Sequence, residues 1–153
     1  MDFKFEIFVL VEKPVAQVYA AVYEPQQLSK YFTTGGASAP LQAGETVTWE
    51  FHDFPGAFPV KVLKSEQKRV IAFEWEANEG GYNTTTEFSF EDLGPHTTKV
   101  TVKESGWQHT QKGLESSYGN CFGWTHMLCC LKVWLEHGIN LREGSFKPSE
   151  KVA

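Results

Sequence analysis

Apolar and polar residues alternate with a period of two in six segments of the chain, and this pattern is typical of strands with one buried face. The segments are residues 3–11, 47–51, 58–62, 71–75, 84–90 and 100–102. The last five follow one another at short spacing, with turn residues such as Asn78-Glu79-Gly80-Gly81 between them. This succession predicts an antiparallel meander of about six strands in total.

The remaining pattern is helical. Two short helices are predicted after the first strand, the first opened by Pro14 and the second closed by Gly35-Gly36. A long helix is predicted from Cys121 to about Gly138, because large apolar side chains recur there at helical spacing. On that helix Lys132 and Glu136 mark the side expected to face water. We expect one domain over residues 1–143 and a frayed tail over residues 144–153.

Length and charge narrow the function classes. A chain of 153 residues suits a single α+β domain, and its net charge of −5 without a basic run argues against nucleic acid or an anionic membrane as a partner. No secretory signal is visible, so a cytoplasmic location is expected. Cys121 and Cys129 would lie ~12 Å apart on one helix, too far for a disulfide. Free thiols fit a reducing compartment.

Several segments follow one another in a specific order. They are residues 14–19 followed by 24–25 and 28–32, residues 41–45, residues 69–75, residues 97–102 followed by 104–107, and residues 123–124 with 131–132 and 135–138. Together they resemble the START-like (birch-pollen-allergen-like) superfamily, in the branch of chaperone ATPase activator homologues, also described as polyketide-cyclase-like. The resemblance implies the helix-grip fold, in which a curved antiparallel sheet wraps around a long C-terminal helix. It implies no shared catalytic residues. Tyr31 stands where relatives commonly have Trp.

Candidate catalytic and metal-binding groups are few. His126 and Cys130 have metal-ligand spacing on a helix, but no second cluster would complete a site, so no metal and no cofactor are expected. The same two residues could form a nucleophile pair, but a cysteine inside an apolar helix is poorly placed for one. The strand glutamates Glu74, Glu76, Glu87 and Glu91 could be paired carboxylates, but their parity directs them outward. We therefore assign no catalytic residue.

An inward-facing aromatic set is the strongest functional candidate. Strand parity and helical spacing direct ten side chains toward one interior: Trp49, Phe51, Phe58, Trp75, Thr86, Phe88, Trp124, Met127, Leu128 and Leu131. They could fill a core or line a cavity for an apolar or aromatic small molecule, the usual ligand place in this fold. The favoured hypothesis is a non-enzymatic binding domain. The alternatives are a protein-interaction module for a cytosolic chaperone and an enzyme of the polyketide cyclase or dehydratase type.

Overall fold

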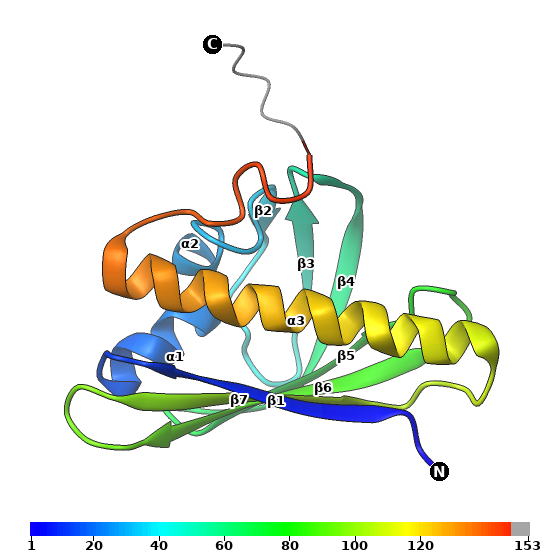
Figure 1. Cartoon of the computed structure of the whole chain (residues 1–153), viewed down its shortest axis with the longest axis horizontal. Helices are drawn as coiled ribbons and strands as arrows, with labels where there is room; N and C mark the ends of the chain where they lie inside the picture. Colours follow the sequence, from blue (N-terminus) through cyan, green and yellow to red (C-terminus); the bar gives the residue numbers. More distant parts are fainter. Residues whose placement is uncertain (148–153) are drawn as a thin grey trace.

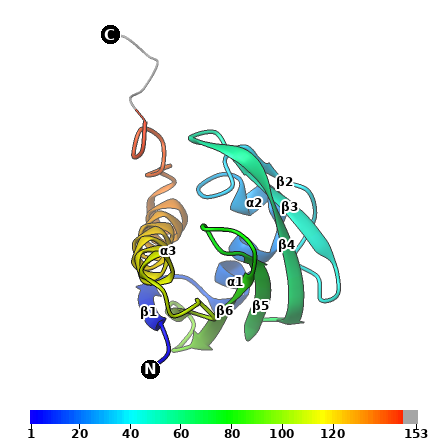
Figure 2. The ribbon, with the colours of Figure 1, turned by 90° about the vertical axis from the view of Figure 1, so that its right-hand side faces the viewer.

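The computed structural model describes residues 1–147 and has a single curved sheet that holds one long helix on its concave side (Figures 1 and 2). The sheet has seven antiparallel strands in the order β1-β7-β6-β5-β4-β3-β2. The elements in chain order are β1 (Lys4–Val11), α1 (Val15–Tyr23), α2 (Pro25–Leu28), β2 (Gly36–Ala37), β3 (Thr46–Phe51), β4 (Phe54–Glu66), β5 (Val70–Glu76), β6 (Asn83–Asp92), β7 (Thr98–Ser105) and α3 (Gln111–His137). The predicted α+β helix-grip fold is confirmed.

The strand count differs from the prediction by one, because β2 adds a two-residue strand. Gly36 and Ala37 pair with Glu50 and Trp49 of β3. A segment this short has no alternation of its own to reveal it. The expected tail lies partly outside the described residues, which end at residue 147.

Helix α3 begins ten residues earlier than predicted, at Gln111. The Thr110 side chain caps it by accepting a hydrogen bond from the Gly113 N–H at 3.0 Å. A Cβ on Gly113 would lie 2.0 Å from the Gln108 carbonyl oxygen, so only glycine fits this turn. The buried positions of the first turns are Gly113, Ser116 and Ser117, which are too small to give an apolar stripe in the sequence.

Helix α3 holds the edge strand β1 through Lys132 and Glu136, two residues that the sequence predicted to face water. The Lys132 Nζ donates to the Leu10 carbonyl at 2.7 Å and lies 2.7 Å from Glu136 Oε2. The same Glu136 oxygen accepts from the Glu12 N–H at 2.9 Å. These two side chains therefore hydrogen-bond backbone groups at the open edge of β1. Unpaired backbone groups at a sheet edge can otherwise pair with a strand of another chain. The Lys132 side chain is 37% exposed, in keeping with the predicted wet side, whereas Glu136 is only 11% exposed because it binds β1.

Inside the fold, the core lies between α3, α1 and the concave face of the sheet. After α3, residues 138–147 turn back and run past α2 and β2 toward the β3–β4 turn (Figure 1). Gly138 makes this reversal with a positive φ of 67°, a conformation that glycine adopts readily. None of the helices among the described residues combines the length and hydropathy that crossing a bilayer requires.

Candidate functional site

The ten side chains predicted to line the interior all lie in or against the core. Trp49, Thr86, Phe88, Trp124, Met127, Leu128 and Leu131 are buried, whereas Phe51, Phe58 and Trp75 are half-buried. Strand β3 supplies Trp49 and Phe51, and α3 supplies the four residues from Trp124 onward. The sequence therefore identified side chains that share one interior.

The aromatic rings of this interior contact one another directly. The Trp75 ring lies 5.8 Å from that of Trp49 and 5.5 Å from that of Trp124, measured between centroids. Phe88 packs edge-on against Trp124 at 5.3 Å. Such spacings are those of favourable aromatic pairs in protein cores. Trp75 is the half-buried member of this group, so it connects the interior with the surface.

A buried carboxylate lies beside these rings, and the sequence interpretation missed it. Glu104 is 1% exposed and accepts hydrogen bonds from four residues. Trp75 Nε1 and Trp124 Nε1 donate at 3.1 and 2.9 Å, Thr84 Oγ1 at 2.6 Å, and Asn120 Nδ2 reaches both oxygens at 3.0 and 3.1 Å. Glu104 thus fixes two tryptophan rings, one from the sheet and one from α3.

The signal for Glu104 was present in the sequence. Its residue number has the same parity as those of Val100 and Val102, which are buried on β7. Parity alone therefore predicts an inward side chain. Four donors hold the carboxylate as an acceptor inside a closed core, whereas a general acid or base needs access to the substrate. The geometry favours a structural role for Glu104.

Two other polar atoms of the interior have no hydrogen-bond partner within residues 1–147. They are Trp49 Nε1 and Thr86 Oγ1, both fully buried. Thr86 pairs in register with Phe73 on one side and Glu104 on the other, so it lies among the same rings. Nearly all buried polar groups in native proteins are hydrogen-bonded, to protein or to water. These two atoms are therefore the polar groups of the interior that an incoming molecule could satisfy.

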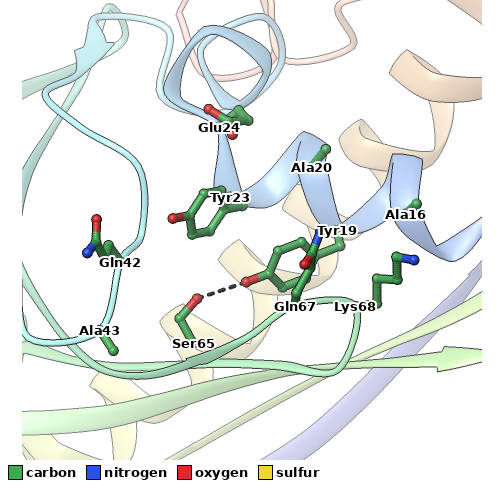
Figure 3. A pocket seen from close by; sticks show the side chains of 10 residues that line it. All are labelled: Ala16, Tyr19, Ala20, Tyr23, Glu24, Gln42, Ala43, Ser65, Gln67 and Lys68. Carbon is green, nitrogen blue, oxygen red and sulfur yellow. Dashed lines mark hydrogen bonds between the residues drawn. The ribbon is translucent and has the colours of Figure 1, made fainter.

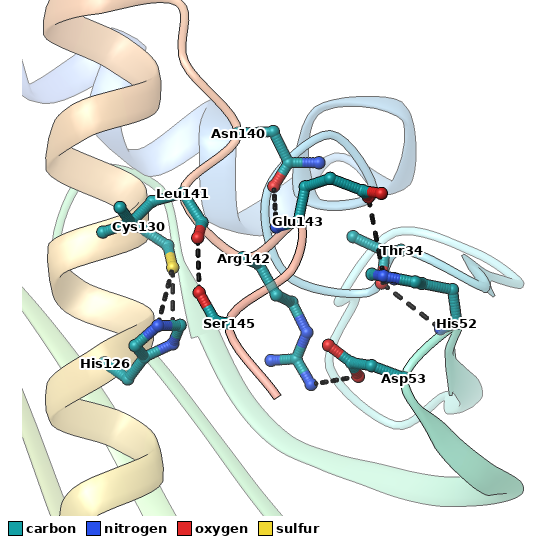
Figure 4. A network of polar contacts seen from close by, with 10 residues as sticks. All are labelled: Thr34, His52, Asp53, His126, Cys130, Asn140, Leu141, Arg142, Glu143 and Ser145. Atoms are coloured by element: carbon teal, nitrogen blue, oxygen red, sulfur yellow. Dashed lines mark hydrogen bonds and ion pairs between the residues drawn. The ribbon is translucent and has the colours of Figure 1, made fainter. Parts of the chain in front are cut away.

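A second polar cluster lies where residues 138–147 meet the β3–β4 turn (Figure 4). Arg142 Nη2 donates to Asp53 Oδ1 at 2.7 Å, and both side chains are buried. The guanidinium carbon also lies 4.7 Å from the Phe51 ring centroid and 5.6 Å from that of Phe32. Arg142 is thereby placed against the aromatic interior.

His126 and Cys130 do come together, with Nδ1 and Sγ 3.5 Å apart. Burial raises the pKa of the Cys130 thiol to about 11, although the Arg142 charge opposes this. Burial and the Arg142 charge lower the pKa of His126. At neutral pH the pair is therefore a thiol beside a neutral imidazole, not an activated nucleophile. Within residues 1–147 no three His, Cys, Asp or Glu side chains come together as metal ligands would.

Two surface hollows lie away from the predicted site. The larger, about 490 Å³, lies between α1 and the β4–β5 turn, where Tyr19 hydrogen-bonds Ser65 at 2.8 Å (Figure 3). The smaller, about 250 Å³, lies between the start of β1 and the first turns of α3. None of the ten predicted residues lines either hollow.

The comparison with protein families decides the assignment. Residues 12–136 match the family described as activator of Hsp90 ATPase homolog 1-like protein. The chain belongs to this family. The matched segment includes α3 almost to its end, whereas Arg142 lies beyond it.

Solved structures support the same fold for this family member. A protein from Staphylococcus saprophyticus is 26% identical, with a TM-score of 0.75 over 93% of this chain and 96% of that one. DynU16, from the dynemicin biosynthetic locus, is 24% identical, with a TM-score of 0.78 over 92% of this chain and 49% of its own. The Aha1 dimer from Colwellia psychrerythraea is 22% identical, with a TM-score of 0.72 over 88% and 97% of the two chains. No curated protein sequence matches the chain.

Proposed function

We propose that this domain is a non-enzymatic binding protein for a small apolar or aromatic molecule, held between α3 and the sheet. The observation that carries the proposal is the pair of unpartnered buried atoms, Trp49 Nε1 and Thr86 Oγ1, within the aromatic interior. A ligand with a flat apolar body and one hydrogen-bonding group would contact the rings and satisfy either atom. Pockets of this kind are mostly apolar with few polar groups.

Binding requires a movement of side chains, because the rings pack against one another in this structure. Trp75 is the natural point of access, since it is half-buried while Trp49 and Trp124 are buried. Its ring is tied to Glu104 by one hydrogen bond of 3.1 Å. A ligand that displaces Trp75 would change the surroundings of two further tryptophans, so binding should alter tryptophan fluorescence.

The test is a screen of fatty acids, flavonoids and polycyclic aromatics by thermal shift and tryptophan fluorescence, together with native mass spectrometry of the purified protein. A ligand that binds only the native state adds ~2.7 kcal/mol of stability at a hundredfold excess over its dissociation constant. The proposal is contradicted if no compound shifts the melting temperature and no small molecule co-purifies.

Thr86→Val separates a binding role from a packing role. The substitution keeps the side-chain shape and removes a hydroxyl that has no partner within the described residues, so the unliganded protein should be as stable as before or slightly more stable. Ligand affinity should fall. Thr85→Val is the matched control, because Thr85 is the exposed neighbour on the same strand. Equal effects of the two substitutions on affinity would speak against an interior site.

A second candidate is interaction with a cytosolic chaperone. The family description names an ATPase activator of Hsp90. The outer face of α3 carries Tyr118 and Phe122, which are 67% and 63% exposed. Large exposed aromatic side chains are enriched in protein interfaces. A pull-down with Hsp90, compared between the unmodified protein and a Tyr118→Ser/Phe122→Ser variant, tests this candidate independently of any small molecule.

A further inference from the structure

Arg142 reaches the aromatic interior from a segment that lies outside the matched family region. Its side chain is nine-tenths buried, and its guanidinium lies against the rings of Phe32 and Phe51. Phe32 in turn packs against Trp49 at 5.5 Å and Trp124 at 5.4 Å. One aromatic ring therefore separates Arg142 from the tryptophans of the proposed binding region.

The ion pair of Arg142 with Asp53 is incomplete on both sides. A guanidinium can grip a carboxylate with two parallel N–H···O bonds. Here one such bond is made, from Nη2 to Oδ1 (Figure 4). Within residues 1–147, the buried Arg142 Nε and the buried Asp53 Oδ2 have no partner. Arg142 thus keeps a donor without an acceptor, on a guanidinium that lies beside the rings of Phe32 and Phe51.

We propose that Arg142 selects ligands that carry a carboxylate on an apolar or aromatic body. Asp53 holds the guanidinium in place until the ligand carboxylate accepts a hydrogen bond from it. The inference rests on the proposed function and specifies that the ligand carries a negative charge. The net charge of the chain is −5, which disfavours anions at long range, so a preference for an acid needs donors inside the fold, and Arg142 offers a charged one. Arg142 is the cation that contacts these rings among the described residues.

The experiment compares two probes of nearly equal shape, 2-naphthoic acid and 2-naphthalenemethanol, by fluorescence titration and calorimetry at neutral pH. The unmodified protein should bind the acid at least about tenfold more tightly, since a hydrogen bond to a charged group is a strong one. Asp53→Asn should increase the affinity for the acid, because it removes the competing carboxylate, and should leave the affinity for the alcohol unchanged.

The decisive variant is the double substitution Asp53→Asn/Arg142→Met, which removes both charges and so leaves no buried charge unpaired. It should fold, bind the alcohol as before, and lose the preference for the acid. An acid preference that persists in this variant would overturn the inference. Equal binding of the two probes by the unmodified protein would also overturn it while leaving the proposed function standing. If neither probe binds any folded variant, the inference is overturned, and the ligand screen and native mass spectrometry described above decide the proposed function separately.

Discussion

Two buried carboxylates at the border of the interior are stabilised in opposite ways. Glu104 forms no ion pair within residues 1–147, yet four neutral residues from β5, β6 and α3 satisfy it with five hydrogen bonds. Asp53 has a cation, Arg142, yet one of its oxygens is unpartnered within the described residues. The carboxylate in the ion pair is therefore less completely hydrogen-bonded than the carboxylate bound by neutral donors. The number of directed donors decides how well a buried carboxylate is satisfied.

The two arrangements also differ in what they connect. Glu104 joins the centre of the sheet to α3, so it belongs to the framework of the fold. Arg142 lies in the segment that follows α3 and joins it to the β3–β4 turn. Loop segments open at lower free energy than core elements. We therefore expect the bonds of Glu104 to Thr84, Asn120 and Trp124 to be rigid, the half-buried Trp75 to be able to move, and the Arg142 contact to be adjustable.

The largest effect is expected at Glu104. Glu104→Leu leaves two indole N–H groups, a threonine hydroxyl and the Asn120 amide without their acceptor, and should destabilise the protein by about 3–5 kcal/mol. Glu104→Gln keeps one acceptor oxygen and should cost about 1–3 kcal/mol. Denaturant unfolding measures both values.

The control for this prediction is Glu91→Gln on the exposed side of β6, which should change stability by less than about 0.5 kcal/mol. If Glu104→Leu costs no more than this control, the hydrogen-bond cluster does not hold the framework together, and the contrast between the two carboxylates collapses.

A smaller effect is expected at Arg142, although it belongs to the ion pair. Breaking a buried pair by removing one partner typically costs ~3–5 kcal/mol. We expect residues 138–147 to open in this variant and return Asp53 to water, so Arg142→Met should cost only about 1–3 kcal/mol. Adding Asp53→Asn should recover part of that loss, because no charge is then left buried. A loss as large as that of Glu104→Leu would show that the loop cannot open.

The sequence predicted the framework well and the polar clusters poorly, for a physical reason. Alternation places Trp49, Trp75 and Phe88 on one face of the sheet because every inward strand residue obeys the same period. The same parity predicts that Glu104 faces inward, but an acidic residue near the end of a strand is easily interpreted as solvent-exposed. The donors that satisfy it lie 16 to 29 residues away in the chain, so its partners could not be inferred locally.

The contact between Asp53 and Arg142 could not be predicted from the sequence, for a different reason. Asp53 lies in a segment read as a turn, and turns are usually exposed. Arg142 lies 89 residues further on, at the end of the predicted domain. Neither position has any periodicity. Only the return of residues 138–147 past α2 and β2 brings the two together, and that path depends on tertiary packing.

A second ion pair, between Lys132 and Glu136, sharpens the comparison because it is more exposed. Lys132 and Glu136 lie on α3 with side chains 37% and 11% exposed. Exposed pairs contribute little, but Lys132 also bonds the Leu10 carbonyl, so Lys132→Ala should cost about 0.5–1.5 kcal/mol. Unfolding experiments against Arg142→Met then compare a solvated pair with a buried one. A larger loss for Lys132→Ala would mean that burial does not set the value of these pairs.

This pair also predicts a pH dependence. Burial opposes ionisation of Glu136, but hydrogen bonds from the Glu12 N–H and Lys132 outweigh it and lower the pKa of Glu136 below its ordinary value of 4.5. Its contribution to stability is therefore complete above about pH 4.5 and is lost as the pH falls through the lowered value. Glu136→Gln should flatten this part of the stability curve. If Glu136→Gln leaves the fall of stability at acid pH unchanged, Glu136 is not the group responsible for it.

The smallest expected effect is a change in the rate at which the Cys130 thiol is alkylated. Measuring this rate tests directly whether the Arg142 contact opens. Burial raises the pKa of the Cys130 thiol to about 11, and the Arg142 charge opposes that rise. If residues 138–147 stay closed in Arg142→Met, the lost charge raises the thiol pKa further and alkylation at pH 8 slows down, since the thiolate is the reactive species. If they open, Cys130 becomes accessible and alkylation speeds up.

We expect faster alkylation, because the contact of Arg142 with Asp53 and the surrounding rings holds the segment down. The measurement needs Cys121→Ser and Cys129→Ser in both proteins, so that mass spectrometry follows Cys130 alone; the half-buried Cys121 and exposed Cys129 would otherwise react first. Lys132→Ala in the same background is the matched control and should leave the rate unchanged, because its contacts lie on the β1 side of α3. Slower alkylation in Arg142→Met would mean that the segment is as fixed as the Glu104 cluster, and the two ends of the interior would then differ in charge but not in mobility.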